Sequence, residues 1–210
     1  GDYRCIAPNL RGFEKSSSPT EVSAYRVKFL MQDIAALVTI ETADSGGQLE
    51  CLVAHDWGGA VAWGVANQMS HLMKRLCIIN SPHTGTFTRE LKSNPKQQAA
   101  SDYMNFLVRP GFEKALAKDD FKLLFGFFTN AGAENGEYAW LTPELKQKYR
   151  DVWNTGLTGG CNYYRASPLR PPTETDPGAA GTDIPHNLLT VDVPTLVIWA
   201  MNDITLLPEL

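Results

Sequence analysis

The chain has 210 residues, of which 43% are hydrophobic and 20% are charged. This balance is typical of a globular domain and excludes disordered, collagen-like and coiled-coil proteins. The 19 lysines and arginines are outnumbered by 23 aspartates and glutamates, which gives a net charge of -4, so nucleic acid is not an expected partner. No run of about 18 apolar residues predicts a membrane span.

Cysteines and histidines bear on the redox compartment and on metal binding. The four cysteines are Cys5, Cys51, Cys77 and Cys161. The first three lie in apolar, strand-like runs, so we predict buried free thiols, a reducing compartment and a cytoplasmic location. The four histidines are His55, His71, His83 and His186. Neither set has the spacing of a zinc site or of a helical metal site, so we predict no metal.

The first part of the chain alternates predicted strands with predicted helices. The strands cover residues 3–8, 49–54 and 75–79, and the helices, with apolar residues at helical spacing, cover residues 22–40 and 60–69. This alternation predicts a parallel sheet in an α/β domain. The strand at 49–54 is mostly apolar, which is typical of a strand buried on both faces.

The pattern then changes for about a hundred residues. Helices are predicted at 95–107, 111–116, 119–128 and 142–154, a loop rich in Pro, Gly and Thr follows at 168–181, and a further strand covers 195–199. We therefore expect a core formed by residues 1–82 and 187–210, interrupted by a helical cap at 83–186. Such a cap would close a pocket at the carboxyl ends of the strands.

The most informative stretch is residues 52–59, Leu-Val-Ala-His-Asp-Trp-Gly-Gly. A strand ends and a helix begins on either side of Asp56, with the small residues Ala54 and Gly58 beside it, as in a nucleophile elbow. The alternative is that Asp56 simply caps the helix. A carboxylate nucleophile that attacks an sp3 carbon forms an alkyl ester, so this site favours epoxides or alkyl halides over carboxylic esters. The backbone N–H of Trp57 is the expected oxyanion donor.

Two segments carry a resemblance to a known family. Residues 3–12 (Tyr-Arg-Cys-Ile-Ala-Pro-Asn-Leu-Arg-Gly) and 55–59 (His-Asp-Trp-Gly-Gly) resemble the α/β-hydrolase-fold epoxide hydrolases and their haloalkane dehalogenase relatives. Asn9 stands where the family usually has Asp. The resemblance implies a mostly parallel sheet with an inserted helical cap, a small apolar epoxide and water as substrates, and no cofactor.

Epoxide opening and halide release need different groups in the cap. The resemblance implies that Tyr103 and Tyr164 hydrogen-bond the epoxide oxygen, since each lies in a segment similar to one that holds such a tyrosine. Tyr163 is a competing candidate, and either tyrosine of the pair could instead belong to the core. A haloalkane dehalogenase would instead use N–H donors, with Trp57 as one of them.

The remaining catalytic groups are only partly present. The resemblance makes Asp203, just after the strand at 195–199, the acid that orients a histidine. None of the four histidines fits that partner. The histidine is expected beyond Leu210 and a His-Gly-x-Pro oxyanion loop before Gly1, so the chain is expected to be a fragment lacking both ends and inactive in full turnover. A third alternative is a non-catalytic relative that binds a ligand.

Overall fold

Three parallel strands form one sheet in the computed structural model, which describes residues 3–135 and 138–210. They are β1 (Leu52–His55), β2 (Leu76–Ile79) and β3 (Thr195–Ile198), in that spatial order. Leu76 of β2 lies opposite Leu52 on one side and opposite Thr195 on the other. Because the strands are parallel, their carboxyl ends meet at one edge of the sheet, which is where Asp56 and Asp203 follow β1 and β3.

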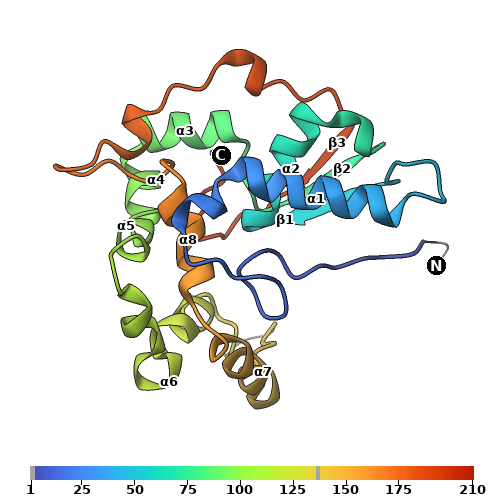
Figure 1. The fold of residues 1–210 in the computed structure, drawn as a ribbon. Helices are drawn as coiled ribbons and strands as arrows, with labels where there is room; N and C mark the ends of the chain where they lie inside the picture. The colour runs from blue at the N-terminus through green and yellow to red at the C-terminus, as the bar shows by residue number, and fades with distance from the viewer. Residues whose placement is uncertain (1–2, 136–137) are drawn as a thin grey trace.

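Two helices cover the sheet from one side. A 3-10 turn, η1 (Val22–Tyr25), leads into α1 (Val27–Glu41), and α2 (Asp56–Gln68) follows β1 directly, with η2 (Ser70–Leu72) after it. Figure 1 shows α1 and α2 side by side against the strands, with α1 in front of them in this view. Apolar side chains of α1, α2 and β2 form the main core, where Val65 and Ile78 are fully buried.

Six α-helices lie between β2 and β3 in the described part of the chain, and we call them together the helical insertion. They are α3 (Thr84–Ser93), α4 (Pro95–Ala100), α5 (Tyr103–Leu107), α6 (Phe112–Thr129), α7 (Pro143–Trp153) and α8 (Thr158–Ala166). The 3-10 turns η3 (Gly178–Gly181) and η4 (His186–Leu188) then lead to β3. Figure 1 shows α6 and α7 standing away from the sheet, whereas α8 returns to contact η1.

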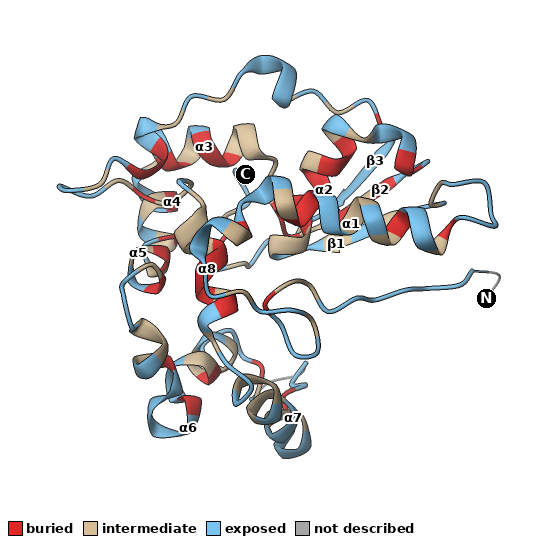
Figure 2. Cartoon of the chain, viewed as in Figure 1, coloured by how far each residue is buried: buried red, intermediate tan, exposed pale blue. Residues whose placement is uncertain are grey.

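The strand predicted at residues 3–8 is wrong. This segment runs extended, without strand pairing, and Tyr3 and Ile6 are 71% and 43% exposed. Figure 2 shows the same stretch as exposed along almost its whole length. The described residues place no strand beside it, so its backbone groups have no ladder to join.

Burial of the strands and cysteines also differs from expectation. Val53 of β1 is 60% exposed and Leu196 of β3 is 58% exposed, because the helices cover only one face of the sheet. Cys5 and Cys51 are exposed thiols rather than buried ones, Cys77 is half-buried, and Cys161 is buried. All four cysteines are free, as predicted. Burial raises the pKa of the Cys161 thiol to about 11.

The helices of the insertion match the sequence in part. The predicted helix at 95–107 is two helices, α4 and α5. The pair predicted at 111–116 and 119–128 is confirmed, because non-helical backbone at 118–121 divides α6 into two helical parts. Helices α3 and α8 were not predicted. No described helix is both long enough and apolar enough to cross a lipid bilayer.

Candidate active site

Asp56 occupies a strained turn between β1 and α2. Its φ is +50°, a left-handed conformation that costs on the order of 1–3 kcal/mol for a residue other than glycine. The Ser81 hydroxyl compensates by donating a hydrogen bond to the Asp56 main-chain oxygen at 2.7 Å. Ser81 is itself held, because the Trp63 indole donates to its carbonyl at 3.1 Å. A serine at the end of the neighbouring strand therefore fixes the turn.

The small residue that the turn requires is Gly59 rather than Gly58. A Cβ placed on Gly59 would lie 2.3 Å from Cβ of Ser81, whereas one on Gly58 would meet nothing within 4 Å. The expectation that Gly58 supplies the necessary small neighbour is thus wrong. The close approach is instead between α2 and the end of β2.

Asp56 opens onto a pocket between the sheet edge and the helical insertion. Among the residues that line it are three of the predicted site residues, Trp57, Tyr103 and Tyr164. The rest of the lining is mainly apolar and consists of Ala60, Ser81, Pro82, Thr84, Phe87, Met104, Ser167, Leu169 and Leu206. A small apolar molecule with one polar end fits this distribution.

The carboxylate of Asp56 is poorly solvated although the residue is open to the pocket. Desolvation by the surrounding protein atoms raises its pKa, and the nearby charge of Asp203 raises it further. The Trp57 backbone N–H acts in the opposite direction as a hydrogen-bond donor, as does the charge of His55. A weakly solvated carboxylate close to a backbone donor is a more reactive nucleophile than one in bulk water.

The two tyrosines of the pocket face each other and the carboxylate. Their ring centroids are 6.1 Å apart and their planes are inclined by 77°. Desolvation raises the pKa of both phenols, and the charge of Asp56 raises both further. Trp57 and Tyr103, whose rings lie against the Tyr164 ring, act in the opposite direction and lower the pKa of Tyr164. Both phenols therefore remain protonated next to Asp56.

Tyr163 does not share this environment. It is 1% exposed, lies outside the pocket lining, and donates its hydroxyl hydrogen bond to the main-chain oxygen of Arg11 at 2.8 Å. Its burial raises its pKa as well, so the pKa shift alone does not distinguish it from Tyr164. Geometry does: Tyr163 points into the core, and Tyr164 points into the pocket.

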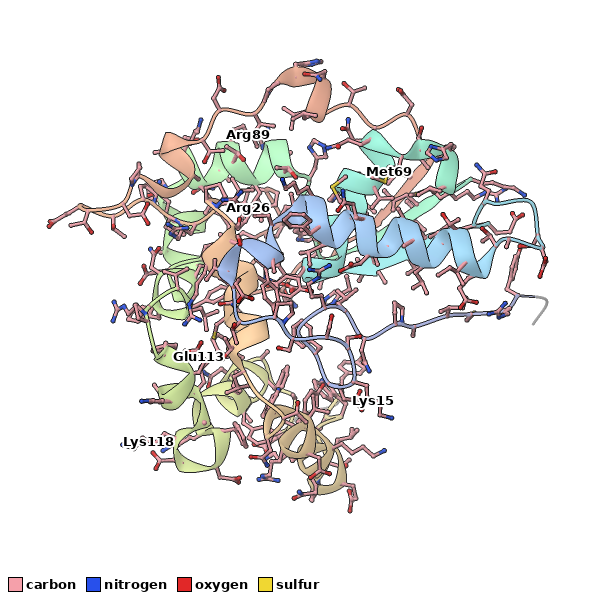
Figure 3. The ribbon with its side chains drawn as sticks, in the orientation of Figure 1. Lys15, Arg26, Met69, Arg89, Glu113 and Lys118 are labelled. Carbon is pink, nitrogen blue, oxygen red and sulfur yellow. The ribbon has the colours of Figure 1, made fainter. Side chains whose placement is uncertain are left out.

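Close backbone contact places α8 and hence Tyr164. A Cβ on Gly159 would lie 2.5 Å from Cα of Gly12, and Gly12 has a φ of +87°, so both positions require glycine. Arg165 then ties α8 to the neighbouring helices, since it donates to the main-chain oxygens of Val108 and Arg109. It also pairs with Glu113, labelled in Figure 3 where α6 begins.

Asp203 is held by an unusually complete set of donors. Its Oδ1 accepts from the Thr205 backbone at 2.8 Å, from the Thr205 hydroxyl at 2.8 Å and from the Leu206 backbone at 2.9 Å. Its Oδ2 accepts from Nδ2 of Asn80 at 2.9 Å. Burial raises the pKa of Asp203, but these four hydrogen bonds outweigh it, so the pKa lies below its usual value.

Asn80 is a site residue that the sequence did not reveal. It follows β2, is 7% exposed, and uses its Oδ1 to accept from the Ala200 backbone N–H at 3.0 Å. The same side chain therefore braces both the end of β3 and the Asp203 carboxylate. Asn80 and the adjacent Ser81 both follow the central strand, β2. Asn80 binds Asp203 after β3, and Ser81 binds Asp56 after β1. A strand end followed by consecutive small polar residues is the signal that could have found them.

The histidines do not complete the site. Among the described residues, no hydrogen bond joins a histidine to Asp203. His83 caps α3, where its Nδ1 accepts from Gly85 N–H at 3.2 Å, and burial lowers its pKa. No group of three or more His, Cys, Asp or Glu side chains that could hold a metal occurs within residues 3–135 and 138–210.

Comparison with known proteins decides the family. A family model described as "alpha/beta hydrolase fold" matches residues 2–209. The chain belongs to the α/β-hydrolase family.

Within this α/β-hydrolase family, several of the similar proteins are named epoxide hydrolases. Human epoxide hydrolase 4 is 31% identical, with 96% of this chain and 52% of that protein covered. An AB hydrolase superfamily protein, YfhM of Bacillus subtilis, is 30% identical, with 96% and 64% covered. The chain spans about half the length of the first of these relatives.

Solved structures agree with this resemblance. The epoxide hydrolase of Bacillus megaterium, solved with an inhibitor, aligns with a TM-score of 0.81 at 28% identity, covering 96% of this chain and 68% of that one. An epoxide hydrolase from metagenomes of hot environments aligns with a TM-score of 0.75 at 36% identity, covering 98% and 68%. The α/β-hydrolase fold with its parallel sheet, expected from the sequence, is confirmed.

Proposed function

We propose that this chain carries the nucleophile, the acid and the ring-opening tyrosines of an epoxide hydrolase that works through an aspartyl ester. The observation that carries the proposal is that Asp56, Tyr103 and Tyr164 line one pocket, close enough for the carboxylate charge to raise the pKa of both phenols. The named epoxide hydrolases that the chain resembles support the same substrate class.

In the first step, a carboxylate oxygen of Asp56 attacks one carbon of the epoxide ring. The carbon–oxygen bond of the ring breaks, its electron pair goes to the ring oxygen, and that oxygen takes a proton from Tyr103 or Tyr164. The product is a 2-hydroxyalkyl ester of Asp56. The phenols contribute because an alkoxide leaving group needs a proton donor, and general acids of this kind accelerate reactions by about 10²–10⁴-fold.

The second step hydrolyses the ester. Water attacks the carbonyl carbon of the Asp56 ester, and the Trp57 N–H, which already acts on that carboxyl group, stabilises the oxyanion. The acyl–oxygen bond then breaks, the departing oxygen takes the proton that the base removed from water, and the vicinal diol leaves. The proton left on the Asp56 carboxyl returns to the tyrosine that gave one up in the first step. This step needs a base oriented by Asp203, and the described residues bring no histidine to that carboxylate. We therefore propose that residues 1–210 form the ester and retain it.

The helical insertion takes the part of a cap in this scheme. It supplies Tyr103 from α5 and Tyr164 from α8, and it closes the pocket over the sheet edge. We accordingly assign residues 83–186 to a cap and residues 1–82 and 187–210 to the hydrolase core. The free thiols, two of them exposed, further support a reducing location such as the cytoplasm.

Haloalkane dehalogenase is the alternative function. Halide release would use two N–H donors, but among the described residues Trp57 is the only indole in the pocket lining. No asparagine lines the pocket within the described residues. A pair of phenols therefore favours an epoxide oxygen as the leaving group.

The experiment exposes the chain separately to a small terminal epoxide and to a primary alkyl bromide, and follows intact mass. We expect a gain of one whole epoxide mass on the wild-type chain and none on Asp56→Asn, with little reaction with the bromide. An alkyl adduct from the bromide alone, with bromide released, would favour the dehalogenase. The absence of either adduct in a folded chain would favour a ligand-binding relative.

A further inference from the structure

A buried glutamine joins the cap to the segment that carries the acid. Gln97 of α4 is 0% exposed, and a buried amide is tolerated only when it is hydrogen-bonded. Its Nε2 donates to the Ser101 hydroxyl and to the main-chain oxygen of Thr205, both at 2.8 Å. Its Oε1 accepts from the Leu207 N–H at 3.0 Å. Two of the three bonds thus cross from the cap to the chain after β3.

The segment that Gln97 holds, residues 205–207, has no helix or strand hydrogen bonds of its own. The Thr205 and Leu206 N–H groups donate to Asp203 instead. The Leu206 carbonyl accepts from the Trp199 indole at 3.3 Å. Since side chains supply these partners, the backbone path of the segment depends on where Gln97, Asp203 and Trp199 stand.

This segment serves the site in two ways. Its N–H groups at 205 and 206 account for two of the donors that keep the Asp203 pKa low. Its Leu206 side chain, 6% exposed, forms part of the pocket wall and packs with Phe87 and Met104. A displacement of the segment would therefore loosen the acid and deform the wall together.

We propose that Gln97 is a positioning residue, which sets the place of Leu206 in the substrate pocket and of the donors to Asp203 through its two bonds to residues 205–207. The proposal rests on the proposed function for its catalytic meaning. Because Gln97 belongs to α4 and Asp203 follows β3, the position of the Asp203 carboxylate then depends on how the cap packs against the core.

The chain offers a matched control in the next residue. Gln98 also lies in α4 and makes a side-chain hydrogen bond, from Nε2 to the Leu91 main-chain oxygen in α3 at 2.8 Å, but no hydrogen bond joins it to residues 205–207. Gln97→Met and Gln98→Met both replace an amide by a side chain of similar length. Only the first removes the link to the acid segment.

The first readout is the rate of epoxide adduct formation on Asp56 as a function of epoxide concentration. We expect Gln97→Met to raise the half-saturating concentration several-fold while the limiting rate stays within about twofold, because the pocket wall changes and the nucleophile does not. Gln98→Met should change neither. A Gln97→Met chain that keeps the wild-type half-saturating concentration would count against the proposal.

The second readout needs no epoxide, so it separates this proposal from the proposed function. The Asp203 carboxyl is titrated by carbon-detected NMR, and its pKa should rise in Gln97→Met, because the loosened segment donates less well, and stay unchanged in Gln98→Met. If Gln97→Met does not fold, Gln97→Leu, which also removes the amide and adds no charge, takes its place. An unchanged Asp203 pKa in a folded Gln97 variant would overturn the proposal, and a wild-type chain that forms no adduct would overturn only the proposed function.

Discussion

The Ser81 hydroxyl donates a 2.7 Å hydrogen bond to the main-chain oxygen of Asp56 and so joins the end of β2 to the turn after β1. Asp56 keeps a positive φ of 50°, a left-handed backbone conformation that glycine adopts much more readily than other residues. The position of the proposed nucleophile therefore depends on the end of β2 as well as on β1, the strand that precedes it.

The close contact behind this turn predicts opposite outcomes for two adjacent glycines. Gly59→Ala should destabilise the chain by about 1–3 kcal/mol, because its methyl group would collide with Ser81. Gly58→Ala meets open space and should stabilise α2 by about 0.5–1 kcal/mol. Denaturant unfolding measures both changes. A Gly58→Ala loss equal to that of Gly59→Ala would contradict the assigned contact.

The two pocket tyrosines should each matter to ring opening. Tyr103→Phe and Tyr164→Phe should each slow epoxide adduct formation about tenfold or more, and the double variant by about 10²–10⁴-fold, because the leaving oxygen loses its proton donors. Tyr163→Phe is the control. It should leave the rate within about twofold and cost about 1 kcal/mol of unfolding free energy, since the half-buried Arg11 carbonyl loses its donor. If Tyr163→Phe slowed epoxide adduct formation and Tyr164→Phe did not, Tyr163 would be the ring-opening tyrosine instead of Tyr164.

The pKa shifts predict the pH dependence of adduct formation. Only ionised Asp56 attacks, and its pKa is raised, so the rate should climb at a pH above the ordinary carboxyl value of about 4. Both phenols have raised pKa values and must stay protonated, so the rate should fall only above the ordinary tyrosine value of about 10. Rates of mass gain at constant ionic strength test this.

A variant checks the acid limb of the pH profile. The charge of Asp203 raises the pKa of Asp56, so Asp203→Asn should move that limb to lower pH. A full rate already at pH 4 in the wild-type chain would contradict the desolvated carboxylate.

The sequence predicted the three strands of the sheet and the passage from β1 to α2 at Asp56, for a physical reason. Strands β1, β2 and β3 are short apolar runs followed by turn residues, and the family-like segment at 55–59 places Asp56 at a strand end. Residues 3–8 have the same apolar character but do not form a strand, because strand formation needs a partner and the described residues provide none. A local sequence pattern does not show whether a partner strand lies beside the segment.

The parts of the site that stayed hidden depend on tertiary contacts. Helix α8 contains two glycines near its start and was not predicted, since Gly159 weakens a helix locally but permits the backbone of Gly12 to approach. Tyr163 and Tyr164 are adjacent in that helix, and only packing shows which one faces the pocket. Gln97 gave no signal, because the segment it binds lies more than a hundred residues away.

Locating the covalent adduct tests the proposed aspartyl ester most directly. The 210-residue chain is incubated with a small terminal epoxide, digested, and mapped by tandem mass spectrometry, with Asp56→Asn treated in parallel. We predict one epoxide mass per chain, on Asp56, that persists after excess epoxide is removed. An adduct confined to the exposed thiols of Cys5 and Cys51, with Asp56 unmodified, would contradict it.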